Sequence, residues 1–345
     1  MKACALPAGG RNILNNDNTS AAAPASWVPR LARYRQPDDR RAILEVAITA
    51  IPFAALWALM ALSVSISYWL TLLLAVPTAG FMVRLFMIQH DCGHGAMFTS
   101  RRANLWVGRV IGVLTLTPYD FWRQSHALHH ASSGNLDRRG IGDIDTLTVR
   151  EYQARGRWGR LLYRIYRHPI VIFGIGPAYL FIFQQRLPFG AMKSGAMPWQ
   201  STMLTNAAIV ALSVALILVV GFGTFLAVQL PVIGIGASVG VWLFYVQHQF
   251  ERTSWERDPT WTHANAALHG SSFYDLPRPL MWMTGNIGIH HLHHLCSRIP
   301  FYRLPEVLTD HPELRNIGRI TLWESLKCVR LTLWDEEHKR LVPFA

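Results

Sequence analysis

The chain has 345 residues, of which 51% are hydrophobic and only 16% are charged. With a mean hydropathy of +0.18, this composition argues against an ordinary soluble domain and indicates a membrane protein. A net charge of +12 is compatible with nucleic-acid binding, but the arginines flank apolar segments, where they anchor to anionic headgroups, so we expect no nucleic-acid partner.

The N-terminal segment Met1 to Ser26 is polar and lacks an apolar core of signal-peptide length. We expect a disordered tail there, within a cytosolic and pre-membrane segment of residues 1–42. The chain shows no internal repeat. Residues 43–310 are therefore predicted to form one membrane domain, followed by a cytosolic C-terminal segment, 311–345.

Four apolar runs each have about the 20 residues needed to cross the hydrocarbon core of a bilayer. They cover residues 43–62, 67–89, 203–221 and 224–247. Only SVSI separates the first two runs and only FG separates the last two, so we predict two helical hairpins. Arg84 interrupts the second run near its end, where its side chain is expected to snorkel to the interface.

The arginines predict how the hairpins are oriented. Five of them, from Arg30 to Arg41, precede the first hairpin, many more lie between the hairpins, and the hairpin tips carry no lysine or arginine. The positive-inside rule then places both termini and the middle segment on the cytoplasmic side of the inner (cytoplasmic) membrane.

Two further apolar segments, 104–119 and 169–186, are expected to form interfacial helices. If the second of these crossed the bilayer, it would separate the histidines near residue 290 from those near 90 and 126. We therefore predict that it lies in the interface or re-enters the membrane.

Histidines gather in three motifs, HDCGH, SHALHH and HHLHH. Residues three and four apart share a face of a helix, so each motif predicts a cluster of imidazoles. The eight histidines with this spacing are His90 and His94, then His126, His129 and His130, then His290, His293 and His294.

Eight imidazoles exceed one tetrahedral zinc site, and two metal ions that share the set are the economical interpretation. A carboxylate-bridged bundle would show Glu-x-x-His pairs, which are absent near these motifs. His248 follows the fourth run as His90 follows the second, but the residues alone leave open whether it binds metal. A metal pair close to lipid chains suggests redox iron acting with O2 on an alkyl C–H bond, because hydrolysis would serve polar bonds.

The stretches HDCGHGAMF, FWRQSHALHHASSGNLDRRGIGDIDT, FYVQHQFE and GNIGIHHLHHLCSRIPFYRL resemble the conserved boxes of the membrane fatty acid desaturases. The likeness is greatest to acyl-lipid enzymes of the delta-12, or omega-6, kind, and it covers roughly residues 70–304. It implies an all-α integral membrane fold: four spanning helices in two hairpins, with a cytosolic helical cap that holds two histidine-ligated iron ions. It also implies that O2 and two electrons are used to introduce a cis double bond into a fatty acyl lipid.

Carried over to this chain, the resemblance implies that the eight box histidines bind iron, and it adds His248 as a ninth ligand. His291 falls at a variable position of the third box and is expected to be a neighbour of the ligands. Asp91 and Asp145 are candidates to orient ligand imidazoles. For Asp143, a helix cap or an ion pair with Arg138 or Arg139 is the favoured interpretation.

The chain has no haem-attachment motif, no dinucleotide-binding glycine pattern and no cysteine spacing for an iron–sulfur cluster. The reductant is therefore expected to be a separate protein, such as ferredoxin or a similar small carrier. Two alternatives remain at this stage: a hydroxylase or ketolase of the same superfamily acting on a carotenoid or alkane, and a histidine-rich metal transporter. A transporter should place its ligands near the bilayer midplane, whereas these motifs begin where the apolar runs end.

Overall fold

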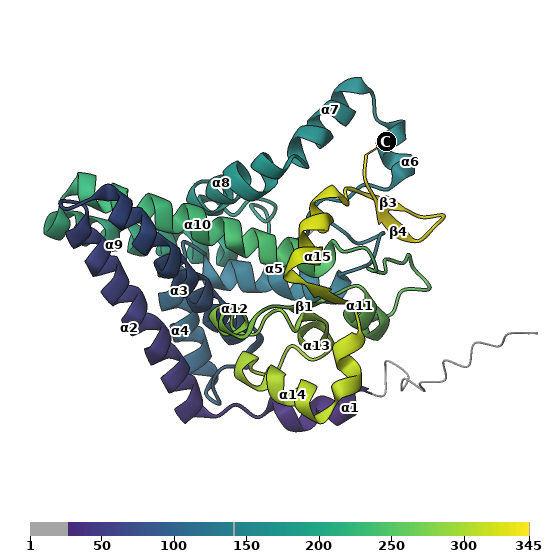
Figure 1. The fold of residues 1–345 in the computed structure, drawn as a ribbon, viewed down its shortest axis with the longest axis horizontal. Coiled ribbons are helices and arrows are strands. Elements are labelled where there is room, and N and C mark those ends of the chain that lie inside the picture. The colour runs from purple at the N-terminus through teal and green to yellow at the C-terminus, as the bar shows by residue number, and fades with distance from the viewer. Residues whose placement is uncertain (1–26, 141, 345) are drawn as a thin grey trace, which may run out of the picture.

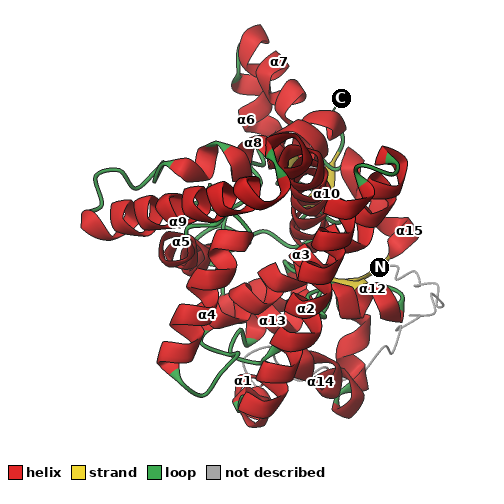
Figure 2. Ribbon diagram, turned by 90° about the vertical axis from the view of Figure 1, so that its left-hand side faces the viewer, coloured by secondary structure: helices red, strands yellow, loops and turns green. Residues whose placement is uncertain are grey.

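The computed structural model describes residues 27–140 and 142–344, and the predicted disordered tail lies outside them. The described chain is predominantly helical (Figure 1), and Figure 2 shows strands only in small patches among the helices. Two short two-stranded sheets, which the sequence did not predict, lie in the part outside the long helices.

Four helices are long and apolar enough to cross a bilayer, as predicted. They are α2 (Asp39–Ser63), α3 (Tyr68–His94), α9 (Ala196–Val220) and α10 (Phe222–His248). A short turn joins α2 to α3, and Gly221 alone separates α9 from α10, which gives the two expected hairpins. In Figure 1 the four helices gather in the left half of the molecule.

The ends of α3 and α10 decide where the histidines lie. Helix α3 does not stop at the last apolar residue but continues to His94, and α10 continues to His248. Gly95 ends α3 in the left-handed conformation (φ 65°), and its N–H donates to the carbonyl of Cys92 at 3.0 Å. The first histidine motif is therefore the last part of a spanning helix.

Shorter elements form the rest of the described chain. The helices are α1 (Trp27–Leu31), α4 (Arg101–Leu114), α5 (Tyr119–Ser132), α6 (Val149–Ala154), α7 (Arg157–Tyr166), α8 (Gly176–Ile182), α11 (His263–His269), α12 (Arg278–Met283), α13 (His290–Leu295), α14 (Leu304–Asp310) and α15 (Leu322–Ser325). The strands are β1 (Phe273–Asp275), β2 (Arg319–Thr321), β3 (Leu333–Asp335) and β4 (Arg340–Val342).

The short sheet β1–β2 fixes the start of the third histidine motif. β1 pairs with β2 in parallel, and Phe273 at its start also bridges Ile289, the residue directly before α13. The side chain of Gln247, near the end of α10, donates to the carbonyl of Ile287 at 3.1 Å. These contacts tie α13 to the end of a spanning helix.

Both segments expected at the interface are helical. Residues 104–119 correspond largely to α4, whereas 169–186 divide into a π-helix (Val171–Ile175), α8 and a short 3-10 turn (Gln184–Arg186). The axis bends by 54° between α7 and this segment. Their placement relative to a bilayer stays a prediction.

Arg84 does not snorkel, contrary to the sequence-based expectation. Its side chain is 1% exposed and forms an ion pair with Glu45 of α2, which is equally buried. Its Nε also donates to the hydroxyl of Thr49 at 3.1 Å, and its guanidinium lies 4.0 Å from the centre of the Trp282 ring. The pair therefore links the first hairpin internally and joins it to α12.

Removing one partner of a buried ion pair leaves the other charged and unpaired. We expect Arg84→Met to destabilise the protein by about 3–5 kcal/mol, seen as a lower midpoint of thermal unfolding in detergent. The double variant Arg84→Met/Glu45→Leu should recover most of the loss. Breaking the exposed Arg138–Asp258 pair with Arg138→Gln should cost only about 0–1 kcal/mol, and an equal loss in both single variants would contradict the prediction.

Candidate metal centre

The structure brings all nine candidate histidines together in two groups. Within each group, one possible donor atom from every residue lies within 4.8 Å of all the others. The first histidine group contains His90, His94, His126, His130 and His293. The second histidine group contains His129, His248, His290 and His294.

The first histidine group joins the ends of α3 and α5 to α13. The Nε2 atom of His126 lies 3.0 Å from that of His94 and 3.1 Å from that of His130. The Nε2 atom of His293 lies 3.1 Å from that of His130. Four ring nitrogens from three helices thus point at one place.

The second histidine group joins α5, α10 and α13. The Nε2 atoms of His248 and His290 are 3.1 Å apart. The other nitrogen of His248, Nδ1, lies 3.2 Å from the carbonyl of Gly270 and 3.4 Å from the hydroxyl of Ser133. Those two acceptors favour a hydrogen on Nδ1, which leaves the lone pair of Nε2 directed into the group.

These spacings fit nitrogen ligands of a metal better than hydrogen bonds among imidazoles. A neutral Nε2 carries either one hydrogen or one lone pair and forms one such hydrogen bond, whereas the Nε2 atoms of His126 and His130 each lie within 3.1 Å of two others. Two nitrogens bound at about 2.1 Å, at right angles, would lie about 3.0 Å apart. In addition, the buried Nε2 atoms of His129 and His294 have no hydrogen-bond partner, as expected of donors that face a cation.

Burial keeps five of the histidines outside the spanning helices uncharged. Loss of solvent, reinforced by neighbouring imidazoles, lowers the pKa well below the usual histidine value. The residues concerned are His126, His130, His290, His293 and His294. A neutral imidazole offers a lone pair, which is the form that binds iron, copper or zinc.

His291 lies outside both groups, as the sequence predicted for a neighbour of the ligands. Its Nε2 lies 3.0 Å from the carbonyl of Leu314, and its backbone N–H donates to the carbonyl of Ser272. It therefore holds α13 against the C-terminal part of the chain and turns away from the histidine groups.

The favoured interpretation of Asp143 was wrong. Its carboxylate lies 2.5 Å from Nδ1 of His129, whereas Arg138 pairs with Asp258 and Arg139 with Glu151. An acceptor at Nδ1 directs the lone pair of Nε2 toward the second histidine group. Asp145, two residues on, makes its hydrogen bonds through its backbone N–H and carbonyl.

Asp91 contacts a member of the first histidine group. One oxygen lies 3.2 Å from Nδ1 of His90, and the other accepts the backbone N–H of Phe301 at 2.6 Å. The same carboxylate thus orients a candidate ligand and holds the segment that follows α13. The sequence analysis missed Gly270 and Ser133, which orient His248. Gly270 acts through its backbone carbonyl, which a pattern of side chains cannot reveal.

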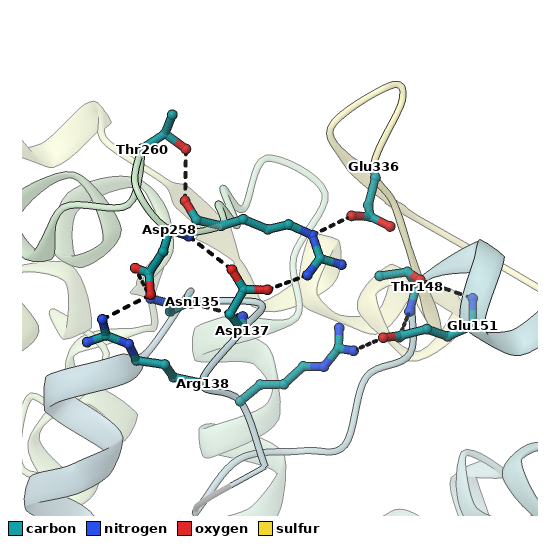
Figure 3. Close-up of polar contacts among 10 residues, drawn as sticks. Asn135, Asp137, Arg138, Thr148, Glu151, Asp258, Thr260 and Glu336 are labelled. Atoms are coloured by element: carbon teal, nitrogen blue, oxygen red, sulfur yellow. Dashed lines mark hydrogen bonds and ion pairs between the residues drawn. The ribbon is translucent and has the colours of Figure 1, made fainter.

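A network of ion pairs holds the loops on both sides of Asp143 (Figure 3). Asn135 and Arg138 both contact the carboxylate of Asp258, at 3.1 and 2.9 Å. Arg257 contacts Asp137 and Glu336, and Glu151 caps the start of α6 by accepting the backbone N–H of Thr148. The segment between α5 and α6 is thereby fixed to the loop after α10.

An apolar cavity of about 490 Å³ reaches the histidines from the side of the long helices. Its walls come from α3, α8 and α10, and His90, His126, His129 and His290 face it, so it touches both groups. The volume falls within the roughly 300–1,000 Å³ of ordinary ligand sites.

Comparison with known proteins identifies the family. The model of the family "Fatty acid desaturase" matches residues 66–323. The chain is 46% identical over 330 residues to a fatty acid desaturase of Bacillus subtilis, which covers 95% of this chain and 93% of the relative. This chain belongs to the fatty acid desaturase family.

More distant desaturases share the same region. An sn-1 acyl-lipid omega-3 desaturase (ferredoxin) of Synechocystis is 31% identical, over 64% of this chain and 61% of its own. An sn-1 oleoyl-lipid 12-desaturase of Anabaena variabilis is 26% identical, over 70% and 69%. The chain is thus an oxidoreductase with membrane-spanning helices and histidine groups able to hold a metal centre.

The contact with Asp143 should matter for metal affinity. Loss of an acceptor behind a ligating histidine typically weakens metal binding by roughly 10- to 100-fold, so we expect Asp143→Ala to lose bound metal that much more readily in a chelator titration of the purified protein. Asp145→Ala is the matched control and should retain metal like the unmodified chain. Equal retention in both variants would show that Asp143 does not support a ligand.

Proposed function

We propose that this desaturase introduces a cis double bond into the acyl chain of a membrane lipid. The observation that carries the proposal is the apolar cavity, which leads from between the long helices to both histidine groups. In the reaction, the acyl chain loses two hydrogens, and O2, two electrons and two protons are converted to two molecules of water.

The proposed ligands are the nine histidines of the two groups, and the proposed metals are two iron ions. Bound iron would supply the redox chemistry with O2 that removal of hydrogen from an unactivated C–H bond requires. The protein contributes imidazole donors with orienting partners: Asp91 behind His90, Asp143 behind His129, and Gly270 behind His248.

The cavity walls suit a hydrocarbon chain. Met82 and Phe86 of α3, Leu180 and Phe181 of α8 and Phe244 of α10 line it. An acyl chain that enters between these residues leaves the hydrocarbon core of the bilayer without crossing bulk water. The same walls exclude solvent from the histidines and hold the acyl chain beside them.

The delta-12, or omega-6, position is the finer part of the proposal. Relatives named as sn-1 oleoyl-lipid 12-desaturases support it at 24–26% identity. Relatives named as omega-3 desaturases match at 29–31% identity, so the position has weaker support than the lipid substrate.

The electron donor and the orientation belong to the same proposal. A relative whose name includes ferredoxin supports a small separate electron carrier. The arginines before α2 and between the hairpins support an active site and termini on the cytoplasmic side of the inner membrane.

Lipid analysis tests the proposal directly. We expect expression in a host without polyunsaturated lipids, with iron and a ferredoxin system supplied, to yield a new double bond that mass spectrometry can locate. His290→Ala should abolish both the product and iron binding, while His291→Gln should keep both, because His291 faces Leu314 and not the histidine groups.

Lipid analysis and a measurement of metal flux in vesicles distinguish the alternatives. Hydroxylated or keto products would favour the hydroxylase or ketolase, and metal flux in vesicles without new lipid products would favour a transporter. An active, iron-loaded His290→Ala protein would contradict the proposed ligand set.

Filling the cavity should change the substrate without disturbing the metal. Gly240 of α10 lines the cavity, and a Cβ added there meets no atom within 4 Å. We expect Gly240→Leu to bind iron normally but to reject long acyl chains, with at least tenfold less product or a shift to shorter chains, as for a loss of about 1.4 kcal/mol or more in binding.

Gly234 is the matched control for this substitution. It lies on the same helix, also has open space around an added Cβ, and is not among the residues that line the cavity. Gly234→Leu should leave the product profile unchanged. Identical profiles for both variants would mean that the acyl chain does not occupy this part of the cavity.

A further inference from the structure

Helix α7 has a packed inner face, an apolar outer face and an edge that carries arginines. Its inner face is packed: Tyr163 is 2% exposed, and its hydroxyl donates to the carbonyl of Thr332 at 2.8 Å. Its outer face carries a stripe of exposed apolar side chains, in which Trp158 and Leu162 are 65% and 66% exposed. Leu161 and Ile165 belong to the same stripe, because they lie three and seven residues after Trp158.

Arginines border this stripe. Arg157 and Arg160 are exposed, and the guanidinium of Arg157 lies 5.3 Å from the centre of the Trp158 ring. At 100° per residue, both arginines fall on the same side of the stripe: Arg157 borders it, and Arg160 lies between Arg157 and the packed face. A short helix with a tryptophan and leucine face beside arginines is typical of segments that lie in a membrane interface.

The apolar stripe continues toward the spanning helices. After the 54° bend, Ile175, Tyr179 and Phe183 are exposed along the following segment, and α8 packs against α10. Figure 1 shows α7 extending outward from α8 beside the bundle. Large apolar side chains are thus exposed both on α7 and on the segment that leads from it to α10.

We propose that α7 is a docking surface for the anionic phospholipid headgroups of the leaflet on the histidine side. The apolar stripe enters the headgroup and acyl boundary, and Arg157 and Arg160 pair with the lipid phosphates. Since α8 follows α7 and supplies Leu180 and Phe181 to the cavity, this contact also holds one cavity wall in place.

The structure favours lipid over an acidic protein partner. A protein carrier would need an exposed basic surface directed away from the bilayer, whereas this stripe is apolar and is followed by more exposed apolar side chains on the segment that packs against α10. Four large apolar side chains at the centre of the face also match an acyl boundary better than the polar rim of a transient protein complex.

A fluorescence experiment on the full chain tests this assignment. An environment-sensitive dye is attached to Leu162→Cys, and the protein is reconstituted in nanodiscs of phosphatidylcholine alone or mixed with phosphatidylglycerol. We expect a blue-shifted dye that brominated lipids quench, with quenching roughly twofold greater in the anionic discs and reduced by high salt.

Charge removal supplies the control. Arg157→Gln/Arg160→Gln should abolish the difference between the two lipid compositions, whereas Arg330→Gln/Arg340→Gln, which removes two exposed arginines elsewhere, should preserve it. Equal quenching in neutral and anionic discs would overturn the headgroup assignment. A dye that stays in water until an acidic electron carrier is added would instead make α7 a protein-docking surface. Neither readout requires desaturase activity, so failure here is distinct from failure of the proposed reaction.

Discussion

The structure depends on one constraint: nine imidazoles must converge from separate parts of the chain on two places. A charged imidazole could not be buried among so many others, so the site requires loss of solvent. Loss of solvent in turn requires walls on every side. The end of α10, the start of α13 and the loop around Asp143 are accordingly fixed by contacts that reach well beyond the histidines.

Helix α3 supplies histidines, lines the cavity and fixes the first hairpin. Its last turns carry His90 and His94, its middle lines the cavity, and Arg84 ties it to Glu45 of α2. Because the helix continues without a break from apolar residues to histidines, a hydrocarbon chain that lies along it remains in an apolar environment until it reaches the histidine groups. The position of His90 and His94 at the end of a spanning helix thus puts the histidine groups next to the apolar cavity.

Much of this could be predicted from sequence because it depends on local pattern. Runs of about 20 apolar residues can satisfy their backbone hydrogen bonds in lipid only as helices, so the four spans and two hairpins follow from hydropathy. Features that depend on distant partners were missed. Arg84 was expected to snorkel because its partner lies 39 residues earlier, and Asp143 was expected to pair with neighbouring arginines because loop geometry is not visible in spacing. Iron was inferred from the position of the histidines beside lipid chains and from the family resemblance, and it stays a prediction because imidazole alone does not select the metal.

The division of the histidines into two groups has a simple helical origin that spacing did not reveal. Successive residues of a helix point about 100° apart, so the two members of a His-His pair cannot face the same place. Accordingly His130 and His293 belong to the first histidine group, and their neighbours His129 and His294 belong to the second.

The pairs four residues apart complete the pattern. Those of the first two motifs, on α3 and α5, both lie in the first group, while His290 and His294 lie in the second. The motifs alone therefore supply five donors to the first group and three to the second. His248, at the end of α10, raises the second group to four. His248 thus adds the fourth donor of the second histidine group from the end of a spanning helix, outside the three motifs.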